Sequence, residues 1–373
     1  MPQVSHTRFL AGVLTLSACL LLGGAFAHGQ STPAPPKTTD QAFKNIQVLK
    51  NLPEDRLIPA MQFVSASLGV GCDFCHVQGK FDQDDKKTKL TARKMMQMVA
   101  AINQANFDGH REVTCNTCHA GAVHPVSIPV ISDSGPKPLM PEAAPPANLP
   151  TADQLLDKYV QALGGDAAIR AVSSRVIEGT ASFFGHEVPV DIFNKGGRNK
   201  AGQRISLLHM PDGDNVTAFD GSEGWLSAPG RQLMEMHGDE LDAARMDADL
   251  QFALHLKQNY GELKADQGDK IGARDSYQLV ASNPNQLPLR LYFDKESGLL
   301  LRLVRYADSP LGLNPTRIDF EAYSAVDGVQ VPHRWTVARP SGQFTIQAKE
   351  IRQNVPVSDD KFVKPAAAPP PPH

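Results

Sequence analysis

Two copies of the pentapeptide Cys-x-x-Cys-His start 43 residues apart, at residues 72–76 and 115–119. Two thiols three positions apart on a tight turn are placed to form thioether bonds with the two vinyl groups of one porphyrin, and the histidine that follows is placed to bind its iron. The motifs therefore predict two haem c groups. The predicted attachment residues are the four motif cysteines, Cys72, Cys75, Cys115 and Cys118. The predicted axial ligands are His76 and His119.

A structural zinc site is the main alternative for these cysteines, because zinc takes four thiolates in tetrahedral geometry. The two pairs are separated by 39 residues, about twice the ~15–20 residues of a zinc ribbon. Zinc also gives no reason for a histidine directly after each pair. A thioredoxin-like redox pair needs only one motif, in a strand–helix unit. The haem interpretation accounts for every cysteine of the chain except Cys19.

The first 27 residues have the pattern of a secretory signal peptide. An apolar run from Phe9 to Phe26 ends in a small-x-small cleavage site at residues 25–27. Two alternatives stay open, a lipid attached to Cys19 and an uncleaved membrane anchor. Export predicts a periplasmic location, which is where haem is joined to apocytochromes. The protein could also associate with the membrane through a partner or a lipid. The balance of 37 basic and 40 acidic side chains gives no sign of a nucleic-acid partner.

Composition divides the rest of the chain into segments. Residues 28–39 are polar and proline-rich, and a second proline-rich stretch without amphipathic period covers residues 126–150. The predicted organisation is a signal peptide at 1–27, a disordered leader at 28–39, a dihaem cytochrome c domain at 40–125, a linker at 126–150, a β domain at 151–364 and a proline-rich tail at 365–373.

Helical periodicity dominates the cytochrome segment. Apolar residues recur at helical spacing over residues 40–50, from Pro53 to Leu68, and over residues 88–104. Gly69 and Gly71 end the second helix directly before the first motif. Five cations of the third helix are candidates to bind haem propionates, although most such charges belong to a solvated helix face: Lys86, Lys87, Lys89, Arg93 and Lys94.

The segment after the linker alternates apolar and polar residues in short runs, which is typical of antiparallel strands. A helix is expected at Ala152–Leu163, ended by two glycines, and a helical insert at about residues 240–256. The predicted strands are 175–184, 187–193, 203–209, 277–281, 289–293, 299–306, 317–323 and 344–351. The predicted fold is therefore a small helical cytochrome domain followed by a curved antiparallel sheet, a half-barrel, with one or two helices.

Each iron needs a second axial ligand if it only passes electrons, and methionine or histidine serves in c-type cytochromes. A helix that carries methionine precedes each motif. The candidates are Met61 before the first motif and Met95, Met96 and Met98 before the second. Packing into a core is the other explanation for a helical methionine.

The string of motifs over about residues 45–125 resembles half of the cytochrome c subunit of photosynthetic reaction centres. It runs from Met61-Gln62-Phe63-Val64 through the first motif and Ala92-Arg93-Lys94-Met95-Met96 to Val113-Thr114 and the second motif. The resemblance implies that the helix methionine is the distal ligand, which pairs Met61 with His76 and Met95 with His119. Met98 is the alternative to Met95.

Two departures from that family matter. Its best-known members hold four haems and end soon after the haem segments, whereas this chain has two motifs and more than 200 further residues. A loop histidine that serves another haem in those members has its counterpart near His110. Ligation of an iron by His110 or His124 therefore stays an alternative.

The C-terminal segment loosely resembles the curved-sheet fold of outer-membrane lipoprotein sorting and carrier domains. The matching residues are Tyr159–Gly165, Phe219–Trp225 and Tyr292–Leu300. This resemblance implies a lipophilic ligand in the concave side of the sheet.

These observations predict a periplasmic dihaem electron carrier rather than an enzyme. Its redox partner would be a protein, either a membrane-bound reaction centre, with a role in photosynthesis, or a respiratory complex. The leading alternative is a dihaem peroxidase with one open iron. A third interpretation is a lipophile-binding or docking module with an accessory cytochrome.

Overall fold

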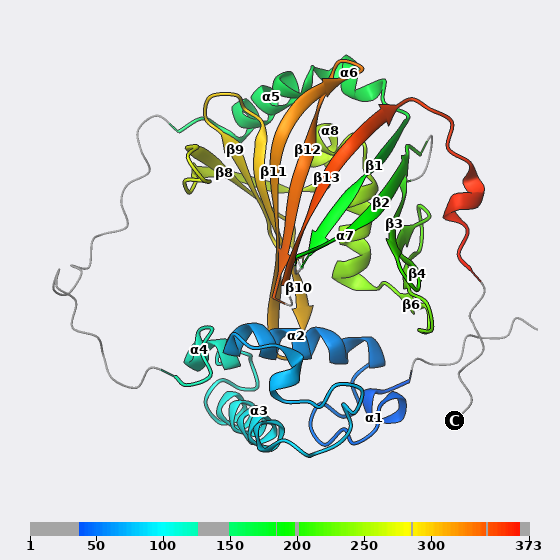
Figure 1. The fold of residues 1–373 in the computed structure, drawn as a ribbon. Helices are drawn as coiled ribbons and strands as arrows, with labels where there is room; N and C mark the ends of the chain where they lie inside the picture. Colours follow the sequence, from blue (N-terminus) through cyan, green and yellow to red (C-terminus); the bar gives the residue numbers. More distant parts are fainter. Residues whose placement is uncertain are drawn as a thin grey trace, which may run out of the picture. The chain divides into compact units, whose positions relative to one another are not determined.

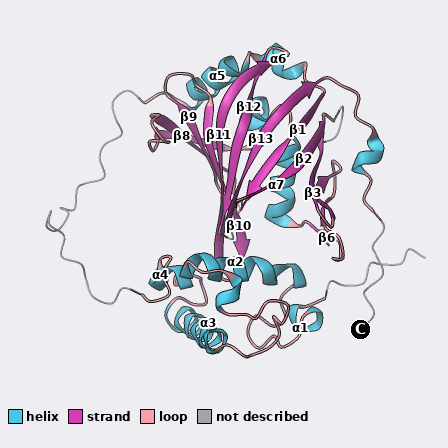
Figure 2. Cartoon of the chain, viewed as in Figure 1, coloured by secondary structure: helices cyan, strands magenta, loops and turns pink. Residues whose placement is uncertain are grey.

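The computed structural model describes residues 37–125, 149–183, 185–197, 201–284, 286–340 and 342–365. A helical part comes first in the chain and a large antiparallel sheet follows (Figure 1, Figure 2). The predicted fold class is therefore confirmed. The predicted signal peptide lies outside the described residues, as do most of the predicted leader, linker and tail.

The helical part is built around two long helices and two short motif turns. Its elements are α1 (Thr39–Ala42), η1 (Glu54–Arg56), α2 (Leu57–Leu68), η2 (Cys72–Phe74), α3 (Lys87–Asn106) and α4 (Cys115–His119). The helices predicted after Pro53 and over residues 88–104 are confirmed as α2 and α3. Of the residues of the longer helix α3, only Lys89, Met96 and Asn103 are buried, which matches a helix with one face in water.

The helix predicted over residues 40–50 is wrong beyond its first turn. The chain leaves α1 at Phe43 and then turns repeatedly, with left-handed backbone at Asn45, Leu49 and Asn51. Asparagine tolerates this conformation because its side chain forms local hydrogen bonds. The Asn45 amide donates to the carbonyl of Asp82 and to the carboxylate of Asp84. Tertiary hydrogen bonds therefore outweigh the apolar period of this segment.

In the described residues the sheet has thirteen strands in the order β6-β5-β4-β3-β2-β1-β13-β12-β11-β10-β9-β8-β7, and all neighbouring strands are antiparallel. β1 and β13 meet in the middle, so each half of the sheet is a meander of neighbouring strands. Strands β6 and β7 form the two edges, so the sheet stays open. The strand bounds are β1 Ser174–Phe183, β2 His186–Lys195, β3 Gln203–Met210, β4 Gly213–Phe219, β5 Gly224–Ser227, β6 Met234–Glu235, β7 Glu262–Gln267, β8 Ser276–Ser282, β9 Leu289–Asp294, β10 Leu300–Ser309, β11 Gly312–Val326, β12 Val329–Arg339 and β13 Gly342–Gln353.

All eight predicted strands are present, and five further strands complete the sheet. The sequence prediction lacks β4, β5, β6, β7 and β12. β7 has polar residues at four of its six positions and β4 begins with Gly-Asp-Asn, so their hydrophobic alternation is weak, and β5 and β6 are very short. Strands of this kind form because a neighbouring strand supplies hydrogen-bonding partners, which a sequence pattern does not record.

Four α-helices, rather than one or two, accompany the described sheet (Figure 1). They are α5 (Ala152–Leu163), α6 (Asp166–Arg170), α7 (Gly238–Ala248) and α8 (Phe252–Asn259), and a short η3 (Asp359–Phe362) follows β13. Helix α5 has the predicted bounds, and α5 and α8 pack on the sheet through a shared cluster that includes Leu156, Leu256 and Leu291. The helix expected at residues 240–256 is broken between α7 and α8, where the Asp249 carboxylate accepts from the Gln251 amide at 2.9 Å and stabilises a turn.

Residues 37–373 form one compact unit by their contacts, and α2 lies against β10 and β11 within it (Figure 1). The sheet thereby supports the helix that leads into the first cysteine motif. None of the helices in the described part of the chain combines the length and the hydropathy that crossing a membrane requires.

Candidate haem-attachment site

The first motif follows the C-terminus of α2. Gly69 ends this helix in the left-handed conformation, with φ of 66°, and the Val70 amide donates back to the Ser65 carbonyl. A one-turn helix over Cys72–Phe74 comes next, and the His76 amide donates to the Cys72 carbonyl at 3.0 Å. This turn brings both thiols of the motif and its histidine to one short stretch of backbone.

The second motif is itself a helix, α4, and reaches the same local arrangement by a different start. Thr114 caps it in a reciprocal pair with Thr117, in which the Thr114 amide donates to the Thr117 hydroxyl at 3.0 Å. Residues three and four apart share a helix face, so Cys115, Cys118 and His119 lie on one side of this turn. The chain then leaves the helix through Ala120, whose φ is 46°.

Both motif histidines use one ring nitrogen in the same way. His76 Nδ1 lies 3.0 Å from the Phe81 carbonyl oxygen, and His119 Nδ1 lies 2.9 Å from the Ala122 carbonyl oxygen. A carbonyl only accepts, so each Nδ1 carries the proton and each Nε2 presents its lone pair. Histidines that bind metals are oriented by this kind of hydrogen bond. The arrangement recurs at both motifs, which are independent in sequence.

The surroundings favour the neutral forms of the His76 imidazole and of two motif thiols, Cys75 and Cys115. Desolvation lowers the pKa of His76, and the charges of Lys89, Arg93 and Lys86 lower it further, although its hydrogen bond to Phe81 raises it. Burial raises the pKa of the Cys75 and Cys115 thiols. All four described cysteines are free thiols. A neutral imidazole is the form that binds a metal.

The methionines differ in exposure along α3. Met96 is buried in the small core of the helical part, so its sulfur is occupied by packing. Met95 and Met98 are exposed and lie one turn apart on the helix. Met61 on α2 is half-buried. Both candidates from the resemblance, Met61 and Met95, and the alternative Met98 are therefore accessible to a group placed beside these helices. The other histidine candidates, His110 and His124, are exposed as well.

Asn103 holds the segment before the second motif against α3. This residue was not assigned a role in the sequence analysis. Asn103 is buried on α3, and its amide forms two hydrogen bonds with the backbone of Val113, at 2.7 Å and 2.9 Å. Val113 precedes Cys115 by two residues, so this pair locks the motif to α3. A polar residue on the apolar face of a predicted helix was the available signal.

Three of the five cations considered for propionates have other partners, and one of them, Lys86, donates to the Asp73 carbonyl. Lys89 is buried, and it donates to the carbonyls of Phe81 and Gln83 and pairs with Asp84 at 3.1 Å. Arg93 pairs with the same carboxylate at 2.8 Å. These two cations hold the pKa of Asp84 far below its usual value. They organise the loop that follows the first motif, whereas Lys87 and Lys94 stay exposed.

The two motifs adjoin each other through a close glycine contact. The Gly121 amide donates to the Ser67 carbonyl at 2.9 Å. A Cβ placed on Gly69 would lie 2.2 Å from the Gly121 oxygen. Gly69 precedes Cys72 by three residues and Gly121 follows His119 by two, so this contact places the two attachment turns next to each other.

The surroundings of the motifs fit a porphyrin. The helical part buries few large apolar side chains, yet it holds seven of the ten large hydrophobic residues that are exposed in the described structure: Phe43, Ile58, Phe81, Leu90, Met95, Met98 and Phe107. Exposed apolar groups at this density mark a surface that binds something apolar. No three His, Cys, Asp or Glu side chains gather at metal-binding distance among the residues described.

Two hollows of the sheet part bear on the predicted lipophilic ligand. One, of about 1130 Å³, has Arg274, Asp294, Arg302 and Asp319 on its wall. The other, of about 710 Å³, has Asp239, Asp249 and Arg305 among its lining residues. Pockets for apolar ligands are walled mainly by hydrophobic side chains, whereas charged and apolar side chains both line these two hollows.

Comparison with known proteins agrees with the resemblance of the motif segment. The sequence profile of the family described as photosynthetic reaction centre cytochrome C subunit matches residues 27–156. The photosynthetic reaction center cytochrome c subunit of Thermochromatium tepidum is 36% identical over 116 residues, which cover 29% of this chain and 28% of that protein. Cytochrome c-554 of Chloroflexus aurantiacus is 36% identical over 85 residues, 21% of this chain and 20% of that protein. The chain thus spans less than a third of the length of these relatives.

Solved structures similar to this chain include proteins of the kind that the C-terminal pattern resembles. A LolA superfamily protein from Nitrosomonas europaea has a TM-score of 0.38 and 16% identity, covering 58% of this chain and 98% of its own. A DUF1329 family protein from Desulfovibrio piger has a TM-score of 0.40 and 16% identity, covering 57% of this chain and 97% of its own. Over residues 27–156, the chain is similar to the cytochrome c subunit of photosynthetic reaction centres.

Proposed function

We propose that this protein is an exported c-type cytochrome that carries two covalently attached haems and transfers electrons. The thiols of Cys72 and Cys75 would hold one haem and those of Cys115 and Cys118 the other, with His76 and His119 as axial ligands. The observation that carries the proposal is the repeated histidine geometry, in which each Nδ1 donates to a backbone carbonyl and leaves Nε2 available. The similarity of residues 27–156 to reaction-centre cytochromes supports it.

The residues of the chain have simple tasks in this function. The haem iron, when bound, supplies a one-electron couple between its ferrous and ferric states. The Phe81 and Ala122 carbonyls hold the two imidazoles in one tautomer and one orientation, which keeps the ligand field constant between redox states. No side chain has to move a proton. The contact between Gly69 and Gly121 supports electron exchange between the two sites, because it keeps the attachment turns adjacent.

Removal of one cysteine pair at a time tests the stoichiometry. We expect the wild-type protein, produced in a host that attaches haem c, to carry two haems by pyridine haemochrome assay and by mass. Cys72→Ser with Cys75→Ser should leave one, and so should Cys115→Ser with Cys118→Ser. Cys19→Ser serves as the matched control and should leave both. A wild-type protein without covalent haem, or a double variant that keeps both haems, contradicts the proposal.

The same preparations address the sixth ligand. Met61 and Met95 are proposed as distal ligands, with Met98 as the alternative to Met95. Two methionine-bound ferric haems give a methionine-to-iron charge-transfer band, and Met61→Leu should remove part of it. A comparison of Met95→Leu with Met98→Leu identifies the second ligand, and Met96→Leu is the control because Met96 is buried in the core. Bis-histidine ligation through His110 or His124 predicts no effect of any methionine change.

Carbon monoxide separates the carrier from the peroxidase alternative. Two six-coordinate, low-spin haems should bind neither carbon monoxide nor peroxide, whereas a peroxidase needs one open iron.

The proposed location is the periplasm or its membrane surface, and the proposed partner is a membrane-bound redox complex, either a reaction centre or a respiratory enzyme. Oxidation of the reduced protein by photosynthetic or by respiratory membranes distinguishes the two partners. Lipid analysis of the purified protein tests the lipophilic ligand.

A further inference from the structure

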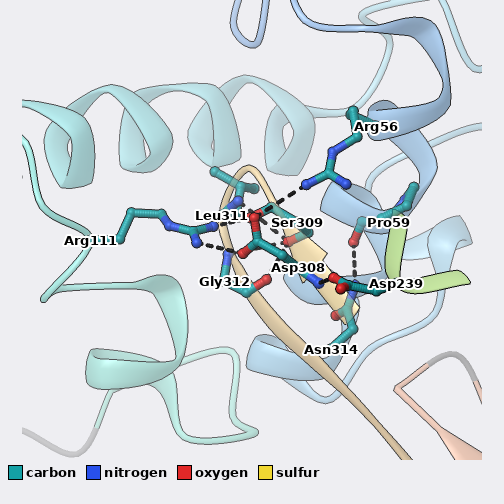
Figure 3. Close-up of polar contacts among 9 residues, drawn as sticks. All are labelled: Arg56, Pro59, Arg111, Asp239, Asp308, Ser309, Leu311, Gly312 and Asn314. Atoms are coloured by element: carbon teal, nitrogen blue, oxygen red, sulfur yellow. Dashed lines mark hydrogen bonds and ion pairs between the residues drawn. The ribbon is translucent and has the colours of Figure 1, made fainter. Parts of the chain in front are cut away.

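The tip of the β10–β11 hairpin lies against the helical part, where one carboxylate meets two arginines (Figure 3). Asp308, at the end of β10, accepts from Arg56 at 3.2 Å and from Arg111 at 2.5 Å. Arg111 also donates to the carbonyl of Ser309. Figure 3 shows the two guanidinium groups reaching Asp308 from different segments of the chain.

The two arginines sit at the starts of the two predicted haem-binding segments. Arg56 is the residue directly before α2, the helix that carries Met61 and leads to the first motif. Arg111 lies four residues before Cys115, in the stretch that Asn103 locks to α3 through Val113. A single carboxylate from the sheet therefore joins the entry of one haem segment to the entry of the other.

Packing reinforces this ionic contact. The buried Asn314 side chain donates to the Pro59 carbonyl, within the first turn of α2, at 2.9 Å. The ring of Phe63, one turn further along α2, lies directly on Gly312, where a Cβ would come within 2.3 Å of two ring atoms. The hairpin thus contacts α2 through hydrogen bonds and through close apolar packing, so its position and that of the helix depend on each other.

The hairpin is in turn fixed from the sheet side. The Ser309 hydroxyl, which is fully buried, donates to the Gly312 carbonyl across the turn at 2.6 Å. The backbone amide of Asp308 donates to a carboxylate oxygen of Asp239, near the start of α7, at 2.8 Å. A carboxylate whose own backbone is held in this way meets its arginines in a fixed place, which favours charge-assisted hydrogen bonds.

We propose that Asp308 is a positioning residue for both haem sites, with the β10–β11 hairpin as the element through which the sheet holds α2 and residues 107–114 in a fixed relation. This inference rests on the proposed function, because it assigns the two held segments to the two haems. Each ion pair is about one-third exposed and weak by itself. Their shared carboxylate and the packing at Gly312 make the contact act as one unit.

The experiment compares Asp308→Asn with Asp212→Asn in the full-length haem-loaded protein. Asp212 is an exposed residue of another hairpin turn, between β3 and β4, so it matches the charge change without the arginines. Hydrogen exchange is measured by mass spectrometry for α2 and for residues 107–114, and the reduction of each haem is followed by spectroelectrochemistry. Asp308→Asn should accelerate exchange in both segments by roughly tenfold, and Asp212→Asn should change neither.

The haem readout separates positioning from general stability. Asp308→Asn should change the ratio of reduced to oxidised haem, at a fixed ambient potential, by a few-fold at both sites. Asp308→Glu keeps the charge and should restore part of the wild-type behaviour. If Asp308→Asn does not fold, Arg111→Gln replaces it and should accelerate exchange in residues 107–114.

The outcomes distinguish this inference from the proposed function. Exchange and potentials in Asp308→Asn that equal those of Asp212→Asn overturn the inference, and so does a response confined to one of the two segments. A wild-type protein without two haems defeats the proposed function instead. In that case the exchange of α2 and of residues 107–114 still decides whether the hairpin holds them.

Discussion

At the scale of single residues, the two candidate haem sites differ in charge. His76 Nδ1 and the Nζ of Lys89 both bind the Phe81 carbonyl oxygen, at 3.0 Å and 2.9 Å. His119 Nδ1 binds the Ala122 carbonyl, to which no lysine or arginine donates among the residues described. A buried cation next to the proximal imidazole favours the reduced, less positive iron. The first haem should therefore have the higher reduction potential.

Replacement of Lys89 tests this difference. Lys89→Gln should lower the potential of the haem attached at Cys72 and Cys75 by roughly 40 mV, equivalent to ~1 kcal/mol, because one positive charge is lost. The negative charge of Asp84, which pairs with Lys89, partly cancels the positive charge and keeps the expected shift in potential small. Redox titration of the protein that lacks the Cys115–Cys118 pair reports the first haem alone. Lys89→Arg retains the charge and should leave the potential near the wild-type value, and an equal fall in both variants would contradict the electrostatic explanation.

At the scale of secondary-structure elements, the end of α2 determines how the two motif turns meet. Gly69 has positive φ and also packs against the Gly121 carbonyl. Gly79, in the loop after the first motif, has a similar φ of 75° but no atom within 4 Å of the place where a Cβ would lie. The two glycines thus share the backbone conformation and differ in the close approach.

This contrast gives a matched pair of variants. Gly79→Ala should lower the free energy of unfolding by about 1 kcal/mol, the usual cost of an alanine in left-handed backbone. Gly69→Ala should cost about 2 kcal/mol more, because its Cβ must displace backbone of the second motif. Thermal unfolding of the haem-loaded proteins, followed by haem absorbance, measures both. Equal losses of stability would mean that the two turns do not need to be in contact.

At the scale of the whole molecule, non-covalent contacts join the helical part, which is the proposed cytochrome part, to the sheet. Helix α2 packs on β10 and β11, and the hairpin contacts of Asp308 and Asn314 add hydrogen bonds between the parts. Both tryptophans of the protein, Trp225 on β5 and Trp335 on β12, lie in the sheet. Tryptophan fluorescence therefore reports the sheet alone, and haem absorbance reports the cytochrome part.

The contact between the parts should make them unfold together. We expect the denaturant transitions by fluorescence and by haem absorbance to coincide in the wild-type protein, because coincident probes mark one cooperative unit. Gly312→Ala places a methyl group in the ring of Phe63 and should separate the two transitions. Gly230→Ala is the control, since Gly230 lies in the turn between β5 and β6, where a Cβ meets open space and only the local cost of the left-handed backbone remains. Separate transitions in the wild-type protein would show that the contact is too weak to couple the parts.

Most helices and strands could be predicted from local sequence patterns. Helix α5 begins at a threonine cap and ends at Gly164 with the bounds that periodicity indicated, and eight strands followed from alternation. These features depend on residues near each other in the chain. The helix predicted over residues 40–50 is wrong for the opposite reason, because Asn45 obtains its partners at Asp82 and Asp84 from a distant segment. Strands β4 and β7 form because β3 and β8 supply their hydrogen-bonding partners, which a weak alternation does not record.

The amino-acid sequence by itself determined the candidate chemistry, since thiol spacing and a following histidine are properties of five consecutive residues. Only the tertiary structure decided which groups orient that chemistry. The carbonyl partners of His76 and His119 lie only five and three residues further along the chain, but no residue type marks a backbone carbonyl as a partner. The contacts of Asp308 with Arg56 and Arg111 join residues 252 and 197 positions apart, which no local spacing relates. Such partners are chosen when the chain packs, because burial leaves each polar group only the neighbours that the fold supplies.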